Sequence, residues 1–290
     1  MKTRFALRLP AVALTAGFIL LVTAPARAGT TIDPVNRYAY AANLGWLNGV
    51  ADTNNGAVVN DYYCSGYLFA ANVGWIDLGS GSPANGIRYQ NLAASDCGVN
   101  NDGLGNLRGY AWGANIGWIA FEATGAPKVD LVTGQFSGYV WSANCGWISL
   151  ATAYGLQTDH ILTGPLAANG LPIPWLMTYF GTTLVDPNAD PDYDGMSNAQ
   201  EYAAGTNPLD PNDKLYIWYI HRTPPITSTL QWTYKMNRLY RFYYRYTLLP
   251  ATPWTQLVTG SESTLGWSSL TVLDGNSQDF YTIEAVRPLP

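Results

Sequence analysis

The chain has 290 residues, a formal net charge of −5, and a composition rich in Gly, Trp and Tyr but poor in charged side chains. So acidic a chain is a poor match for nucleic acid, whose phosphates attract basic surfaces, and a better match for divalent cations. Frequent aromatic residues and glycines favour short strands and turns over helices, and the length is sufficient for two or three domains.

Residues 1–28 have the pattern of a secretory signal peptide. A basic start, MKTRFALR, precedes the apolar run LPAVALTAGFILLVTAP, and Ala26-Arg27-Ala28 provides a small-residue cleavage site. Cleavage there would remove four basic residues and take the net charge from −5 to −9. No later apolar run reaches spanning length, so we expect no transmembrane anchor after cleavage. The expected location is secreted, extracellular or at the cell surface, with the periplasm as the alternative.

Residues 29–165 contain four copies of one aromatic motif. The copies are RYAYAANLGWLNG, GYLFAANVGWIDL, GYAWGANIGWIAF and GYVWSANCGWISL, over 37–49, 66–78, 109–121 and 138–150. Their Trp residues are 29, 43 and 29 positions apart, which indicates a pair of motifs duplicated as a pair. Each copy resembles a hairpin, because Asn and Gly tolerate the positive φ of tight turns. We therefore expect an all-β repeat domain, propeller-like or solenoid-like.

The repeated tryptophans have two interpretations. Period-two alternation places Ile119 and Phe121 on one strand face and Trp118 on the other. The rings could pack between neighbouring units, which the recurrence of the same Gly-Trp pair in every copy favours. Alternatively they could form a ligand-binding platform for sugar rings. The candidate residues are Trp46, Trp75, Trp118 and Trp147.

Three cysteines allow at most one internal disulfide. Cys145 replaces an apolar residue of the other motif copies, and Cys64 also occupies an apolar repeat position, so both are expected to pack as small hydrophobic groups. Cys97 lies in a spacer without a repeat counterpart. A Cys64–Cys97 disulfide is favoured slightly over three free thiols. No Cys/His cluster indicates a zinc or redox site.

Residues 166–213 contain the most specific chemical motif, DPDYDGMSNAQE over 190–201. Its spacing fits the twelve-residue calcium loop D-x-D-x-D-G-x5-E, in which alternating carboxylates and a final glutamate supply the oxygen ligands that Ca²⁺ requires. A helix starting near Pro174 is expected before it, and a second helix over 197–204, ending at Gly205. The predicted ligands are Asp190, Asp192, Asp194, Met196 through its carbonyl, Asn198, and Glu201 with two oxygens.

This segment resembles a known calcium module. The string PWLMTYFG followed by DPDYDGMSNAQEYAAGTNPLDPND is similar to EF-hand, dockerin-type and thrombospondin type 3-like motifs. Such modules are common in large exported proteins of planctomycete and verrucomicrobial bacteria, where they precede a small β-sandwich. A dockerin has two loops and this chain has one, so the resemblance implies a structural calcium clip and not cohesin binding. The GYxWxANxGWI motif also resembles repeats of uncharacterised bacterial surface proteins, which implies no activity.

Residues 214–290 contain alternating apolar stretches separated by turn residues, which predicts a fibronectin III-like β-sandwich. In LYRFYYRYT, Tyr240, Phe242, Tyr244 and Tyr246 share one strand face. Arg241, Tyr243 and Arg245 share the other, which is expected to be the solvated outer face, with contact to glycans or an acidic partner as the alternative.

The whole chain has two His residues and no phosphate-binding or dinucleotide-binding motif, so we expect no catalytic residues and no enzyme activity. The expected function is a non-enzymatic structural or interaction role outside the cell, with calcium as cofactor and a glycan or a surface protein as partner. A carbohydrate-binding accessory protein is the alternative, and a glycoside hydrolase is the third class considered.

Overall fold

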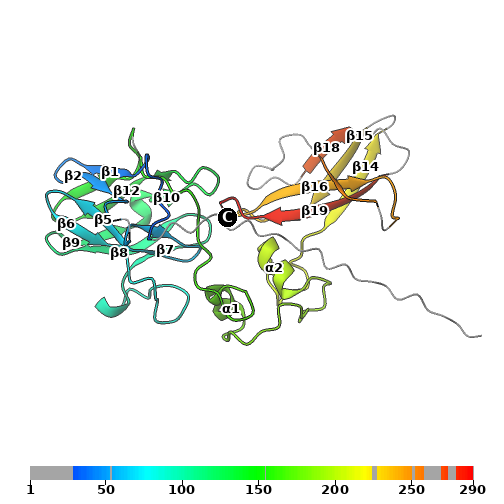
Figure 1. The fold of residues 1–290 in the computed structure, drawn as a ribbon, viewed down its shortest axis with the longest axis horizontal. Helices are drawn as coiled ribbons and strands as arrows, with labels where there is room; N and C mark the ends of the chain where they lie inside the picture. Colours follow the sequence, from blue (N-terminus) through cyan, green and yellow to red (C-terminus); the bar gives the residue numbers. More distant parts are fainter. Residues whose placement is uncertain are drawn as a thin grey trace, which may run out of the picture.

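The structure is a computed structural model that describes residues 29–52, 54–153, 155–223, 227–249, 252–257, 269–273 and 279–289. The predicted signal peptide, 1–28, lies outside the described residues. The described part is mainly β-structure, as expected, with a closed sheet, a linker carrying two α-helices, and a C-terminal pair of sheets (Figure 1). No described helix has the length and apolar character needed to span a membrane.

The four motif copies form four antiparallel hairpins that join edge to edge in one closed eight-stranded sheet. The strands, in pairs, are β1 (Tyr38–Ala41) and β2 (Gly45–Asn48), β5 (Tyr67–Ala70) and β6 (Gly74–Asp77), β8 (Leu107–Gly113) and β9 (Gly117–Phe121), β12 (Tyr139–Ser142) and β13 (Gly146–Ser149). The pairing of β6 with β8 and of β13 with β1 closes the ring. In place of the propeller-like or solenoid-like arrangement expected, the repeats share a single barrel-like sheet, because each hairpin exposes two edges that its neighbours pair.

All four hairpins have the same turn. Gly45 and its three counterparts have φ between 72° and 81°, the left-handed region where a side chain is strained. In the first copy the amide of Leu44 donates to the carbonyl of Ala41 at 3.2 Å, so a tight turn is followed by the left-handed glycine. The Gly before each Trp is therefore a requirement of the turn.

A ring of asparagine side chains joins neighbouring hairpins at the turn end of the sheet. Each motif Asn donates its Nδ2 to a backbone carbonyl in the preceding copy, over 3.0–3.1 Å. The four donor–acceptor pairs are Asn43 to Cys145, Asn72 to Leu44, Asn115 to Val73 and Asn144 to Ile116. The first of these bonds joins the first copy to the last, so the ring closes as the sheet does.

The interior of the closed sheet is filled by alternating layers of large and small side chains. Ala41 and Ser142 are representative of a small layer that lies between the turn residues and the apolar layer of Ile76, Ile119 and their counterparts. Eight strands enclose just enough space for side chains to fill, and small residues in one layer give room to large ones in the next. The confirmed period-two pattern thus provides the core.

Insertions between the hairpins cover the other end of the closed sheet. Strand β7 (Val99–Asn101) adds to β8, and two small hairpins flank it. The remaining short elements are β3 (Val58–Val59), β4 (Cys64–Ser65), β10 (Lys128–Val129), β11 (Phe136–Ser137), and the 3₁₀ turns η1 (Ala94–Asp96) and η2 (Ala123–Gly125).

The linker forms a small unit of its own from two short helices, α1 (Ile173–Tyr179) and α2 (Asn198–Ala204). Pro174 lies in the first turn of α1, as predicted. Ser197 caps α2 in a capping box with Gln200, and Gly205 ends α2 with φ 76°. Buried Trp175 packs against Tyr202, with ring centroids 5.7 Å apart, so the two helices share one apolar cluster.

The C-terminal unit has two three-stranded sheets that share one core. Leu230, Trp232, Tyr240 and Phe242 fill this core, and the rings of Trp232 and Phe242 lie 4.5 Å apart. The buried positions of Tyr240 and Phe242 agree with the face predicted for that strand. One sheet is β14 (Ile217–Thr223), β15 (Thr227–Trp232) and β18 (Ser269–Leu273); the other is β17 (Thr255–Gln256), β16 (Leu239–Arg245) and β19 (Phe280–Val286).

The three units meet at one junction, where α2 lies beside β19 and the closed sheet lies opposite (Figure 1). Arg238 donates to the carbonyls of Tyr202 and Ala203 at 2.9 and 2.7 Å, which occupies the free C-terminal end of α2. Arg287 forms an ion pair with Asp61 of the closed-sheet unit at 2.6 Å. These long-range contacts fix the linker between the two β units.

Candidate functional site

The acidic loop draws three carboxylates together. Ligand atoms of Asp190, Asp192 and Asp194 all lie within 4.8 Å of one another. The chain turns sharply at Gly195, where φ is 96°, and its amide donates to Asp190 Oδ2 at 3.0 Å. The amide of Asp194 donates to Asp190 Oδ1 at 3.2 Å. These bonds hold the loop closed around its own side chains, as the sequence spacing predicts.

Helix α2 adds two further oxygen-bearing side chains to this cluster. Glu201 is completely buried, and neither of its carboxylate oxygens has a hydrogen-bond partner. Asn198 is also completely buried; its Nδ2 donates to the carbonyl of Asp186 at 2.8 Å, and its Oδ1 has no partner. One oxygen each of Asp192 and Asp194 is likewise buried without a partner. Five orphaned oxygens in one place are costly unless a cation neutralises them.

The carboxyl groups of this cluster disfavour one another's ionisation. Burial, followed by the charges of Asp192 and Asp194, raises the pKa of Glu201 to about 7. Burial and the negative charges of Asp194 and Asp190 also raise the pKa of Asp192. A bound cation would reverse this effect, because it favours the ionised form of each ligand. The residues present therefore match a hard metal ion with oxygen ligands.

Met196, the sixth predicted ligand residue, lies within the loop. Its amide donates to Asp194 Oδ1 at 2.7 Å, and its sulfur accepts from the amide of Leu215 at 3.3 Å. The side chain thus packs toward the C-terminal unit. Of the predicted ligands, the structure brings the three aspartates into one cluster, and Glu201 lies near enough for the charges of Asp192 and Asp194 to raise its pKa.

The flanking helices differ from a simple helix–loop–helix arrangement. Helix α2 begins within the loop, whereas residues 180–189 separate the loop from α1. Within that stretch, the carbonyl of Pro187 accepts the amide of Ala199 at 2.9 Å. The loop is therefore held by the segment before it as well as by α2.

The motif tryptophans lie on the outer face of the closed sheet and are 44–47% exposed. They are accompanied there by the aromatic residues of the strand before the turn. We call the twelve rings the aromatic belt: Tyr38, Tyr40, Trp46, Tyr67, Phe69, Trp75, Tyr110, Trp112, Trp118, Tyr139, Trp141 and Trp147.

The rings of the aromatic belt contact one another within each hairpin. Trp118 contacts Tyr110 and Trp112 of its own hairpin, at 6.0 and 4.6 Å between ring centroids. Among the described residues, the other three tryptophans show the same contacts within their hairpins, and the rings are inclined by 60–78°. The rings within each hairpin are therefore not coplanar, and Trp147 also lies close to Gly125, in the segment that follows the third copy. Each hairpin carries a cross-strand aromatic cluster.

The cysteines are free thiols. Cys64 points into the apolar core and is 3% exposed, and burial raises its pKa to about 12. Cys97 is half-buried in a loop, so the Cys64–Cys97 disulfide suggested by the sequence is not formed. Cys145 is buried in the apolar layer at the turn end, as its position in the repeat predicted.

No protein-family model, curated protein or solved structure matches the chain.

Sequence reasoning missed the residues of the junction. Asp61, Arg238 and Arg287 belong to no local motif, and their contacts across the junction join positions 35 or more apart. The only sequence signal for these residues was composition. Basic residues are few in this acidic chain, so each arginine is expected to pair with an acceptor.

Proposed function

We propose that residues 190–201 bind one Ca²⁺ and that this ion orders the linker of an exported, modular, non-enzymatic protein. The observation that carries the proposal is the group of five buried oxygens without partners on Asp192, Asp194, Asn198 and Glu201. Calcium accepts six to eight oxygen ligands in a flexible shell, and this donor set suits it better than it suits metals that prefer nitrogen or sulfur.

The role proposed for the ion is to fix the position of the C-terminal unit. Helix α2 has seven residues, too few to be stable alone in water. Its first turn supplies three of the five orphaned oxygens, and its last carbonyls accept from Arg238 of the C-terminal unit. Lys214, which leads into that unit, donates to the carbonyl of Asp194 at 3.3 Å. Ordering the loop would therefore order the attachment of the next domain.

We further propose that the C-terminal unit is a fibronectin III-like module. The strand orders β14-β15-β18 and β17-β16-β19, with the core between the two sheets, support this proposal. Together with the predicted signal peptide, this organisation favours a structural or interaction role at the cell surface or outside the cell, with a surface protein as partner.

The test is a calorimetric titration of the chelator-treated chain with CaCl₂, with MgCl₂ as the comparison metal. We expect one calcium site per chain, a weaker response to Mg²⁺, and at least a tenfold loss of calcium affinity in Asp192→Asn. Limited proteolysis should cut within 180–197 faster in EGTA than in calcium. Absence of saturable calcium binding would remove the proposal.

A carbohydrate-binding function is the second candidate, and the exposure of the aromatic belt favours it. Half-exposed Trp rings offer faces on which sugar C–H groups can stack. A glycan array with the chain from residue 29 onward tests this, using Trp118→Ala against Trp218→Ala. Trp218 is a matched control because it is 56% exposed on β14, away from the belt. Glycan binding that survives Trp118→Ala unchanged would count against the belt.

A further inference from the structure

A polar cavity of about 250 Å³ lies at the junction of the three units. The closed-sheet unit contributes Asp61 and Tyr62 from the turn between β3 and β4, and the linker contributes Tyr179 and Tyr202 from its two helices. The C-terminal unit contributes the segment around Arg287. The cavity is therefore built by residues that meet only when all three units are in place.

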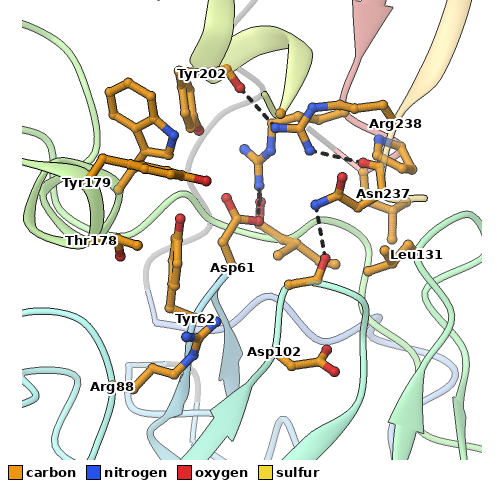
Figure 2. Close-up of a pocket in the computed structure, with 17 residues that line it drawn as sticks. Asp61, Tyr62, Arg88, Asp102, Leu131, Thr178, Tyr179, Tyr202, Asn237 and Arg238 are labelled. Carbon is orange, nitrogen blue, oxygen red and sulfur yellow. Dashed lines mark hydrogen bonds and ion pairs between the residues drawn. The ribbon is translucent and has the colours of Figure 1, made fainter. Parts of the chain in front are cut away.

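Three tyrosine hydroxyls converge in this cavity. Figure 2 shows the hydroxyl ends of Tyr62, Tyr179 and Tyr202 directed toward one another beside Asp61. The Tyr202 hydroxyl is buried without a hydrogen-bond partner, and no hydrogen bond joins the other two hydroxyls to any described residue. Burial raises the pKa of all three phenols, that of Tyr202 to about 12, so each keeps its proton at neutral pH. The cavity therefore offers three hydroxyl groups that can exchange hydrogen bonds with a polar occupant, and the buried Tyr202 hydroxyl has no other described partner.

The cavity has an excess of positive charge although the chain as a whole is acidic. Three guanidinium groups, those of Arg88, Arg238 and Arg287, line it against two carboxylates. The Asp61 carboxylate is paired with Arg287 Nη2 at 2.6 Å. The other, Asp102, accepts from amides of its own loop at 2.8 and 3.0 Å. Both carboxylates thus already accept hydrogen bonds from the protein, whereas Arg287 donates to described residues through only one of its guanidinium nitrogens.

Aromatic faces complete the walls. Tyr62 lies under the Arg88 guanidinium, whose carbon is 5.0 Å from the ring centroid, and buried Trp175 also lines the cavity. Hydroxyl donors and acceptors beside aromatic faces are suited to a polyhydroxylated ring, and spare guanidinium N–H groups are suited to a carboxylate.

We infer that this junction cavity binds a small polyhydroxylated carboxylate of the uronic acid type. The phenols of Tyr62, Tyr179 and Tyr202 would exchange hydrogen bonds with ring hydroxyls, and Arg287 would meet the carboxylate. The cavity is separate from the acidic loop, so its occupancy is a property additional to the proposed metal binding.

The test is a titration of the chain, in excess calcium, with sodium glucuronate, followed by calorimetry and by tryptophan fluorescence. Glucose serves as the neutral comparison and acetate as the small anion. We expect saturable 1:1 binding of glucuronate, at least tenfold weaker binding of both comparison compounds, and at least a tenfold loss of glucuronate affinity in Tyr202→Phe and in Tyr179→Phe. The matched control is Tyr246→Phe, since Tyr246 is 64% exposed on the C-terminal unit and lines no part of the cavity.

Each remaining outcome overturns the inference. If glucose bound as tightly as glucuronate, the site would not recognise a carboxylate. If acetate bound as tightly as glucuronate, the site would not recognise a polyhydroxylated ring. No binding of glucuronate, or binding unchanged in both Tyr→Phe variants, would leave the cavity as solvent space. Circular dichroism of the variants confirms folding, which Phe should preserve because it keeps the ring. The calcium titration on the same preparation is scored separately, so failure here does not affect the proposal for the metal.

Discussion

The substitution Glu201→Gln separates a metal ligand from a merely buried side chain. Gln has almost the same shape but carries no charge and offers one carbonyl oxygen in place of two carboxylate oxygens. In the structure both oxygens of Glu201 are buried without partners, and burial raises its pKa to about 7. Two opposite effects on stability follow, depending on whether calcium is present.

Without calcium, the sign follows from the pKa. Because the pKa of Glu201 is higher in the folded chain than in the unfolded one, the folded state binds this proton more tightly. Stability therefore falls as pH rises from the unfolded value toward 7, and at pH 7.5 the ionised carboxylate destabilises the fold. Gln removes that charge, so in EGTA the variant should unfold at the same temperature as wild type or at a higher one.

With calcium, the order should reverse. At a calcium concentration of 100 times Kd, wild type gains about 2.7 kcal/mol, and a variant with about 100-fold weaker binding gains only about 0.4 kcal/mol. The difference corresponds to a melting temperature lower by about 5–9 °C for a chain of this size. Differential scanning calorimetry at pH 7.5 measures both conditions.

The matched control is Glu122→Gln, which changes an exposed glutamate in a loop of the closed-sheet unit. It should leave the melting temperature unchanged in both buffers. The reasoning is refuted if Glu201→Gln lowers the melting temperature equally in calcium and in EGTA, because the side chain would then act through packing alone. Identity with wild type in both buffers would refute it as well.

Four further predictions concern other parts of the chain. Calcium affinity should fall about 25-fold between pH 7.5 and 5.5 in calorimetric titrations, because protons compete for Glu201 with its pKa near 7; a flat profile would contradict this. Asn144→Ala should lower the free energy of unfolding, measured in urea, by about 1 kcal/mol, because it removes one hydrogen bond of the asparagine ring. Arg287→Met should lower stability by about 3 kcal/mol because it leaves Asp61 unpaired, and an unchanged midpoint would show that the ion pair is not needed. A thiol reagent should modify Cys97 first in the native chain and three thiols after unfolding without reductant, whereas a disulfide would leave one.

The local features of this fold were predictable from the sequence because their causes are local. The alternation of Ile119 and Trp118 between two faces follows from strand geometry, and the left-handed Gly45 follows from the turn. The acidic loop was also predictable, since its carboxylates lie within twelve residues and one bend brings them together.

Closure of the sheet was not predictable in the same way. Whether four hairpins form separate blades, a stack or one ring depends on which edges pair, and each hairpin has the same two edges. In the structure, all four pairs of adjacent hairpins have the same strand register. The facing residues are Asn48 and Phe69, Asp77 and Trp112, Ala120 and Trp141, and Ser149 and Tyr40. The motif asparagines assist the same choice, but their acceptors are backbone carbonyls, which carry no sequence signal.

The junction explains why a single metal loop would matter in a chain with two larger β units. Helix α2 is too short to be stable alone, so its order depends on what is bound at its two ends. Its first turn carries the buried, unpartnered oxygens of Asn198 and Glu201; at the other end, Arg238 binds the terminal carbonyls. The next residue after Glu201 is Tyr202, whose hydroxyl enters the junction cavity. Glu201 and Tyr202 are thus neighbours in one short helix, which also packs on Trp175 and lies beside β19. We therefore expect occupancy of the loop to influence the shape of the cavity through α2.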